Sequence, residues 1–156
     1  MKSWSEVPIP AISGSSELPP LFLSDTATSV KKQVAQKSQY RMYVCGITPY
    51  DATHLGHAAT YLTFDLINRY LRASGAEVNY VQNITDIDDP LLERANRDGV
   101  DWKDLALQQI DLFRGDMENL RVIPPAHYIG AVDAIPLVVD AIKDLQSLST
   151  IYPVDT

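Results

Sequence analysis

Two short β-prone runs on either side of one helical stretch constrain the fold more than any other feature of the sequence. The runs cover residues 41–44 and 78–84, and the helix is expected to begin near Gly56 and to end at Gly75. A helix that connects two strands in this order joins them as parallel neighbours. The sequence therefore predicts a β-loop-α-β unit of an α/β fold, in which ligands bind beyond the carboxyl ends of the strands.

Apolar spacing predicts the helices and the faces that they bury. In the first helix an apolar residue at every fourth position predicts one buried stripe, formed by Ala58, Leu62, Leu66 and Tyr70. Two further helices are expected from the spacing of Ala106, Ile110, Phe113, Met117 and Leu120, and of Ile135, Val138, Ile142 and Leu145. Pro136 fits the last helix only in its first turn, because proline has no N–H to donate.

Composition and charge narrow the classes of function. The chain has 156 residues, of which 46% are hydrophobic, and this suits one domain with an apolar core. A net charge of -7 argues against independent binding to nucleic acid. The only cysteine, Cys45, cannot form an internal disulfide, and the longest apolar run is too short for a membrane span. We therefore expect a cytoplasmic protein.

The first part of the chain differs in composition from the rest. Residues 1–39 combine prolines with serines and small residues, and are expected to form an arm outside the core. One apolar island in this arm, Leu18–Leu23, could form an edge strand.

The loop between the first strand and the helix carries the residues best suited to chemistry. It ends in His54-Leu55-Gly56-His57, at the first turn of the helix, where free backbone N–H groups and the positive end of the helix dipole lie. Two imidazoles at this position can donate hydrogen bonds to phosphate oxygens, and Gly56 allows a ring to lie close to the backbone. The alternative is that His54 caps the helix and that His57 is a partly buried core residue.

A second polar segment, Asn83-Ile84-Thr85-Asp86-Ile87-Asp88-Asp89, follows the next strand. Because the carboxyl ends of parallel neighbours meet at one edge of the sheet, both segments are expected to face one site. Thr48 and Thr85 either contact a substrate or cap turns. For the aspartates we favour the acidic start of a helix, since they lack the glycine spacing of a calcium loop.

Together these segments resemble the cysteinyl-tRNA synthetases, class I aminoacyl-tRNA synthetases whose close relative is the cysteine ligase of mycothiol biosynthesis. The resemblance extends over residues 40–155. It implies a Rossmann-like class I aminoacyl-tRNA synthetase catalytic domain, a parallel sheet with flanking helices, of which residues 40–156 form the first half. It also implies activation of L-cysteine by ATP, accompanied by Mg²⁺, to cysteinyl-adenylate.

The resemblance assigns roles to residues of both segments. His54 and His57 become the catalytic pair, and Cys45 becomes a ligand of a Zn²⁺ ion that binds the thiolate of the substrate cysteine. The adenylate contacts that it implies are Cys45, Gly46, Ile47, Thr48, Gly56, Thr60, Asn83, Ile84 and Thr85. The other zinc ligands, a cysteine and a histidine, are expected beyond Thr156. Without the resemblance, Cys45 would be interpreted as a small buried apolar residue.

Three positions favour the ligase over the synthetase. Pro49 stands where the synthetase typically has valine, Ala59 where arginine is usual, and Pro90 where lysine is usual. The loss of two basic residues fits an acceptor without a phosphate backbone, the amine of glucosaminyl inositol rather than a tRNA 3′ end. The alternatives are a cysteinyl-tRNA synthetase and an inactive nucleotide-binding fragment. These 156 residues contain no Lys-Met-Ser-Lys-Ser loop, so the chain alone is expected not to complete cysteine activation.

Overall fold

The computed structural model describes residues 1–10 and 18–154. The strands are β1 (Phe22–Asp25), β2 (Val30–Gln33), β3 (Gln39–Val44), β4 (Glu77–Ile84) and β5 (His127–Gly130). The helices are α1 (Leu55–Ala73), α2 (Asp89–Asp98), α3 (Trp102–Asn119) and α4 (Ala131–Ser147). None of these helices is long and apolar enough to cross a membrane.

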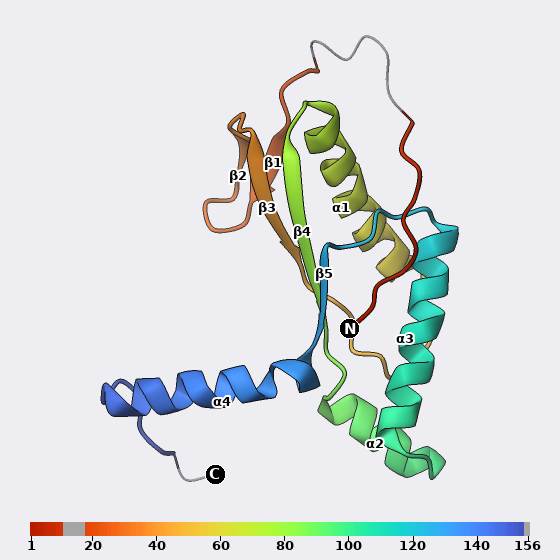
Figure 1. The fold of residues 1–156 in the computed structure, drawn as a ribbon, viewed down its shortest axis with the longest axis vertical. Helices are drawn as coiled ribbons and strands as arrows, with labels where there is room; N and C mark the ends of the chain where they lie inside the picture. Colours follow the sequence, from red (N-terminus) through yellow and green to blue (C-terminus); the bar gives the residue numbers. More distant parts are fainter. Residues whose placement is uncertain (11–17, 155–156) are drawn as a thin grey trace.

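A parallel sheet in the order β3-β4-β5 forms the centre of the fold (Figure 1). Strand β3 pairs with β4 from Gln39↔Glu77 to Val44↔Gln82, and α1 connects the two strands, so the predicted β-loop-α-β unit is confirmed. Helices α2 and α3 lead from β4 to β5, and α1 and α3 lie on the same side of the sheet (Figure 1). The carboxyl ends of β3 and β4 are therefore direct neighbours.

The main core lies between the sheet and helices α1 and α3. Phe113 of α3 is fully buried at its centre, and its ring meets the ring of Tyr61 of α1 edge to face, with centroids 5.1 Å apart. The predicted stripe of α3 is buried from Ala106 to Met117 and reaches the surface at Leu120, which is 38% exposed. The spacing of apolar residues therefore predicted this helix face correctly.

The predicted buried stripe of α1 is right only in part: Leu62 and Tyr70 are partly buried against the core, but they do not lie at the centre of the buried face. The buried residues are Tyr61, Asp65, Asn68 and Leu71, whereas Leu66 is 67% exposed. A repeat of four drifts around a helix that has 3.6 residues per turn, so it does not stay on one face. The polar members of the true face are satisfied by hydrogen bonds: Asp65 accepts from the N–H of Ile123 at 2.8 Å and from Nε of Arg69 at 2.6 Å.

The first residues of the chain belong to the core, contrary to expectation. Trp4 is buried between the rings of Phe113 and Tyr128, each with its centroid 5.8 Å away, and its Nε1–H donates to the carbonyl of Val122 at 2.7 Å. A single tryptophan in a proline-rich segment has no periodicity, so the sequence could not indicate this packing. The expected strand near Leu18–Leu23 begins later, as β1, and pairs with β2 in a separate antiparallel sheet.

Helix α4 begins directly at the end of β5 and extends away from the sheet (Figure 1). Pro136 lies inside this helix and beyond its first turn, so the expected position is wrong. Asp86, expected to begin α2, instead accepts a hydrogen bond from the N–H of Val132 at 2.9 Å and so caps α4. A Cβ at Gly130 would lie 2.5 Å from an oxygen of Asp86, so a larger residue there would displace the carboxylate that caps α4.

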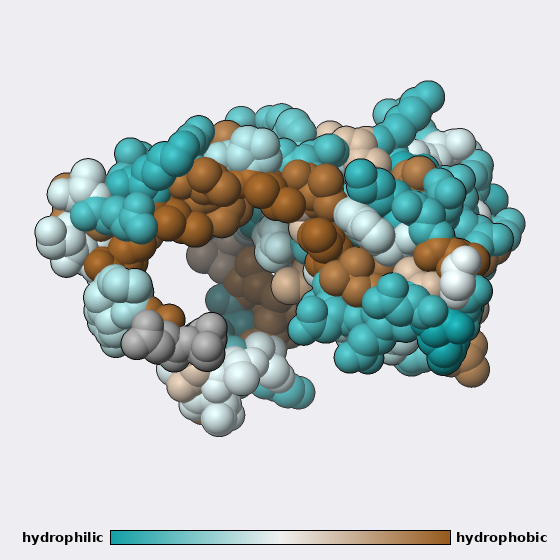
Figure 2. Space-filling model, turned by 90° about the horizontal axis from the view of Figure 1, so that it is seen from below, coloured by the Kyte–Doolittle hydropathy of each residue, from teal (hydrophilic) through white to brown (hydrophobic). Residues whose placement is uncertain are grey.

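No residue of α4 is buried. Its exposed apolar side chains are Ile135, Leu137, Val138, Val139, Ile142 and Leu145. Figure 2 shows apolar surface gathered along the side of the molecule toward which α4 extends in Figure 1. The predicted apolar stripe therefore exists, but it does not contribute to the core of the described residues.

Replacing Trp4 with alanine is expected to lower the free energy of unfolding by about 3–5 kcal/mol, because a cavity opens beside Phe113 and the carbonyl of Val122 loses its donor. Ile9→Ala is the control in the same segment, since Ile9 is 45% exposed, and should change stability by at most about 0.5 kcal/mol. Urea unfolding followed by circular dichroism measures both. Equally small changes would contradict a structural role for Trp4.

Candidate functional site

A hollow of about 540 Å³ opens beyond the carboxyl end of β3, beside the start of α1. Its lining consists of Cys45, Gly46, Ile47, Thr48, Tyr50, Asp51, Ala52, His54, His57, Thr60 and Tyr61. Most of the residues expected around a ligand from the sequence thus share one cavity. The other expected residues, Gly56, Asn83, Ile84 and Thr85, are not part of this lining.

The ends of β3 and β4 are held together by close backbone contact. A Cβ at Gly46 would lie 1.7 Å from the carbonyl oxygen of Asn83, so only glycine allows this approach. The Asn83 side-chain oxygen accepts from the N–H of Gly46 at 2.8 Å and from the hydroxyl of Tyr43 at 2.9 Å. The N–H of Thr85 donates to the carbonyl of Ile47 at 3.0 Å. Asn83 thus joins the two strand ends.

The two histidines form a capping box at the start of α1. Nδ1 of His54 accepts from the N–H of Gly56 at 3.0 Å, and Nδ1 of His57 accepts from the N–H of His54 at 3.2 Å. An accepting Nδ1 carries no proton, so each neutral ring has its proton on Nε2. The capping role raised as an alternative for His54 is confirmed, and it leaves both Nε2–H groups as donors. Gly56 makes room for the His54 ring, since a Cβ there would lie 2.8 Å from Cε1.

Burial changes the acidity of two groups at the hollow. The pKa of His57 is lowered from 6.5 by partial burial and, to a smaller extent, by the neighbouring His54, whose ring centroid is 4.2 Å away. The pKa of Tyr61 is raised, first by burial and then by the nearby Cys45. Tyr61 stays protonated and donates to the carbonyl of Cys45 at 3.1 Å. Tyr61 is not among the residues that the sequence predicts for this site, because the predicted stripe of α1 does not include it.

Cys45 lies at the rim of the hollow with an exposed side chain. The interpretation of Cys45 as a small buried residue is therefore wrong. Within the described residues, no three His, Cys, Asp or Glu side chains come together as a metal site. These residues do not form a complete zinc site by themselves, and zinc binding stays a prediction.

The threonines are held by the second polar segment. Thr48 donates its hydroxyl proton to Asp88 at 3.1 Å, and the Thr85 hydroxyl accepts from Nδ2 of Asn83 at 3.4 Å. Asp88 is also the N-cap of α2, and Asp89 lies in the first turn, so the predicted acidic helix start is confirmed for these two residues. Because the Thr48 proton is used in this way, its lone pairs point elsewhere and can accept a hydrogen bond from a ligand.

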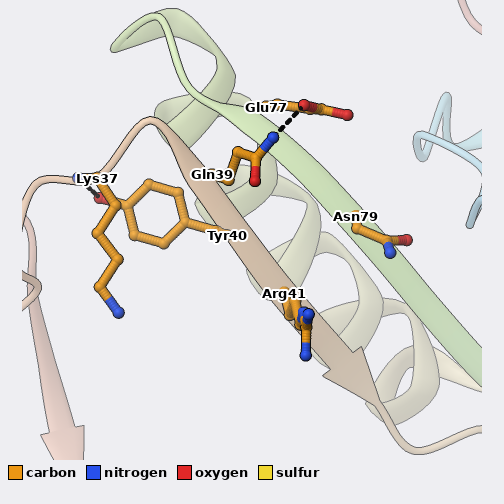
Figure 3. Close-up of a pocket in the computed structure, with 6 residues that line it drawn as sticks. All are labelled: Lys37, Gln39, Tyr40, Arg41, Glu77 and Asn79. Atoms are coloured by element: carbon orange, nitrogen blue, oxygen red, sulfur yellow. Dashed lines mark hydrogen bonds between the residues drawn. The ribbon is translucent and has the colours of Figure 1, made fainter.

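A second hollow, of about 510 Å³, lies on the open face of the sheet (Figure 3). It is lined by Lys37, Gln39, Tyr40, Arg41, Glu77 and Asn79. Gln39 and Glu77, which begin β3 and β4, are joined there by a 3.0 Å hydrogen bond. This hollow is at the amino ends of the strands, whereas ligands of parallel α/β sheets bind at the carboxyl ends. We therefore take the first hollow as the candidate site.

The sequence profile of a family described as "tRNA synthetases class I (C) catalytic domain" matches residues 31–156. The chain belongs to this family. The expected class I fold, with a parallel sheet and flanking helices, is thereby confirmed.

Curated relatives from several bacteria carry the name L-cysteine:1D-myo-inositol 2-amino-2-deoxy-alpha-D-glucopyranoside ligase. The protein so named, with the suffix 2, from Corynebacterium jeikeium is 59% identical over 156 residues. The one from Nocardia farcinica is 56% identical over 155 residues. Each match covers 99% of this chain and 37% of the relative, so the chain spans little more than a third of their length.

Two solved structures of Mycobacterium tuberculosis methionyl-tRNA synthetase, both with methionyl-adenylate, share the fold. One has a TM-score of 0.53 at 26% identity and covers 55% of this chain and 17% of its own. The other has a TM-score of 0.55 at 27% identity and covers 61% of this chain and 19% of its own. The common part of the fold is therefore more than half of this chain.

The lowered pKa of His57 predicts a stability that depends on pH. Between the folded-state pKa and about 6.5, the unfolded chain binds more protons than the folded one, so stability rises with pH there. This contribution of His57 to the free energy of unfolding is fully present above about pH 6.5, and it is lost as the pH falls below that value.

Urea unfolding at pH 7.5 and 5.5 measures this effect, and proton NMR of the ring measures the pKa itself. In His57→Gln, where glutamine keeps the capping geometry, this part of the pH dependence should vanish. In the control His127→Gln, on β5, it should remain. An NMR midpoint for His57 at or above 6.5 would show the prediction to be wrong.

Proposed function

We propose that the hollow binds cysteinyl-adenylate, and that the chain is part of an ATP-dependent ligase that joins L-cysteine to the amine of glucosaminyl inositol. The observation that carries the proposal is the meeting of Cys45, Thr48 and the two capping histidines around one cavity at the ends of β3 and α1. The names of the relatives support the choice of substrates, and the methionyl-adenylate of the solved structures supports the choice of intermediate.

In the first step, a carboxylate oxygen of cysteine forms a bond to the α-phosphorus of ATP, and the bond from that phosphorus to pyrophosphate breaks. Negative charge then grows on the phosphate oxygens. The Nε2–H groups of His54 and His57 are the donors for these oxygens, and the positive end of the α1 dipole lies beside them. Because the capping box fixes both tautomers before substrate binds, little reorganisation is needed during the reaction.

The other residues of the lining hold the amino acid and the nucleotide. Thr48, whose proton is engaged by Asp88, accepts from the substrate ammonium, and the nearby carboxylate complements its charge. Gly46, Ile47 and Thr60 form the walls of the adenylate pocket. Residues 83–85 do not line the hollow, and they support it through the hydrogen bonds that hold the ends of β3 and β4 together. In the second step, the sugar amine bonds to the activated carbonyl carbon and AMP leaves.

Two metal ions form part of the proposal. Mg²⁺ accompanies the phosphates of ATP. Cys45 would supply one ligand of a Zn²⁺ ion, whose preference for sulfur would favour the thiol of cysteine over the hydroxyl of serine. Residues other than those described here must supply its remaining ligands, because one donor does not hold zinc. Use of ATP agrees with the cytoplasmic location expected from the sequence.

The 156-residue protein is expected to bind a non-hydrolysable sulfamoyl analogue of cysteinyl-adenylate, measured by calorimetry. Gly46→Ala should weaken this binding by more than about tenfold, because the new Cβ forces the ends of β3 and β4 apart. Gly115→Ala is the matched control: a Cβ there meets nothing within 4 Å, and alanine favours the helix. The chain alone should not support cysteine-dependent exchange of pyrophosphate into ATP. Absence of analogue binding would contradict the proposed adenylate site. Rapid exchange of pyrophosphate would contradict the expectation that this chain alone does not activate cysteine.

The acceptor is tested with a chimera that joins this chain to the matching remainder of the Corynebacterium jeikeium relative. Offered cysteine, ATP, glucosaminyl inositol and tRNA, the chimera should form the sugar amide and leave tRNA uncharged. It should also bind one zinc ion per chain, and Cys45→Ser should abolish that binding. The unaltered relative is the control for assay conditions. Charged tRNA without sugar amide would establish the synthetase instead.

A further inference from the structure

We propose that Arg94, on α2, is a positioning residue for the adenylate site and acts through the loop of residues 48–53. The inference rests on the proposed function, because its consequence for ligand binding assumes that the adenylate occupies the hollow beside this loop. Four residues of the loop line that hollow, namely Thr48, Tyr50, Asp51 and Ala52. The loop also leads directly into His54, the N-cap of α1. Its position therefore determines where the histidine pair begins.

The loop contains no helix or strand. Its one internal backbone hydrogen bond among the described contacts runs from the N–H of Tyr50 to the carbonyl of Thr48, at 2.9 Å. A segment with so little backbone pairing keeps a defined shape only through contacts with side chains around it. For this loop, those contacts come from α2 and α3.

Arg94 supplies the contact at the middle of the loop. Its Nη1 donates to the carbonyl of Tyr50 and lies 2.8 Å from Oδ1 of Asp51. Its Nε, on the other side of the planar group, lies 3.2 Å from Oδ2 of Asp98 within α2. The side chain of Arg94 is only 24% exposed, so these bonds are partly shielded from water. One guanidinium thus joins α2 to both the backbone and a side chain of the loop.

Two other contacts hold the ends of the loop but leave its middle free. Thr48 is bonded to Asp88 at the start of α2, and Thr53 is bonded to Asp116 of α3. Tyr50 and Asp51 lie between these points. Pro49 is buried, so it also holds the first half of the loop, but among the described contacts only Arg94 reaches Tyr50 and Asp51 from another element.

Arg94 also neutralises a charge at the site. Asp51 lines the hollow, and its pKa is lowered by the N–H of Ala52 and by the Arg94 guanidinium, so its carboxylate stays ionised. An uncompensated carboxylate there would repel the phosphate of an adenylate. The contact that positions the loop therefore also removes an unfavourable charge.

The chain offers a matched control on the same helix. Arg97 is bonded to Asp98 and is 70% exposed. Replacing Arg97 removes the same positive charge from α2 and keeps every contact described between Arg94 and the loop. Asp98→Asn is a second control, since it removes the partner of Arg94 within α2 while the bond to Tyr50 remains.

The test compares Arg94→Gln, Arg94→Lys and the two controls in the 156-residue protein. In Arg94→Gln, hydrogen exchange of the amides of residues 50–54 should accelerate by about tenfold, while amides of β4 should be unchanged. Affinity for the sulfamoyl analogue of cysteinyl-adenylate should fall by about tenfold. Arg94→Lys keeps the positive charge but cannot contact both the loop and Asp98 through a planar group. Its exchange rates and its affinity for the analogue should therefore lie between those of Arg94→Gln and the unaltered protein. Arg97→Gln and Asp98→Asn should match the unaltered protein.

The outcomes separate this inference from the proposed function. Faster exchange throughout the chain, or an effect of Arg94→Gln no larger than that of Arg97→Gln, would overturn the positioning role. Failure of the unaltered protein to bind the analogue would overturn the proposed function, whereas the exchange rates of residues 50–54 would still decide whether Arg94 holds the loop. Unchanged analogue affinity in Arg94→Gln, with faster loop exchange, would overturn the link between loop and site.

Discussion

The contact between the ends of β3 and β4 is the constraint on which the rest of the site depends. At Gly46 the two backbones are so close that the carbonyl of Asn83 occupies the place of a side chain. This contact brings the loop after β3 and the segment after β4 to the same edge of the sheet, although Gly46 and Asn83 are 37 residues apart in the sequence. The capping histidines, the threonines and the start of α2 all take their positions from this junction.

The groups proposed for chemistry at this site also serve the local structure. His54 and His57 complete the first turn of α1, and the same hydrogen bonds set which ring nitrogen carries the proton. Asp88 begins α2 and at the same time orients the hydroxyl of Thr48. These residues can therefore have a structural and a functional role at once, because the hydrogen bonds that stabilise the helix starts also orient the side chains toward a ligand.

Local pattern was enough to predict the parallel crossover and the buried face of α3, whereas most of the lining of the hollow was predicted only through the family resemblance. Local pattern failed where distant contacts decide. Asp65 is buried because Ile123 donates to it, and Asp86 leaves the start of α2 because the first turn of α4 needs an acceptor. The short strand β5 has only four residues, too few for an alternating pattern to stand out. These features depend on pairs far apart in sequence, which a single sequence does not reveal.

The packing of Trp4 sets an order of events during synthesis. Its indole bonds to the carbonyl of Val122, which lies 118 residues later in the chain. While a ribosome makes the protein, the first residues therefore wait unpaired until α3 and the turn after it have emerged. The crossover of β3, α1 and β4 can assemble in the meantime, before the site into which Trp4 packs exists.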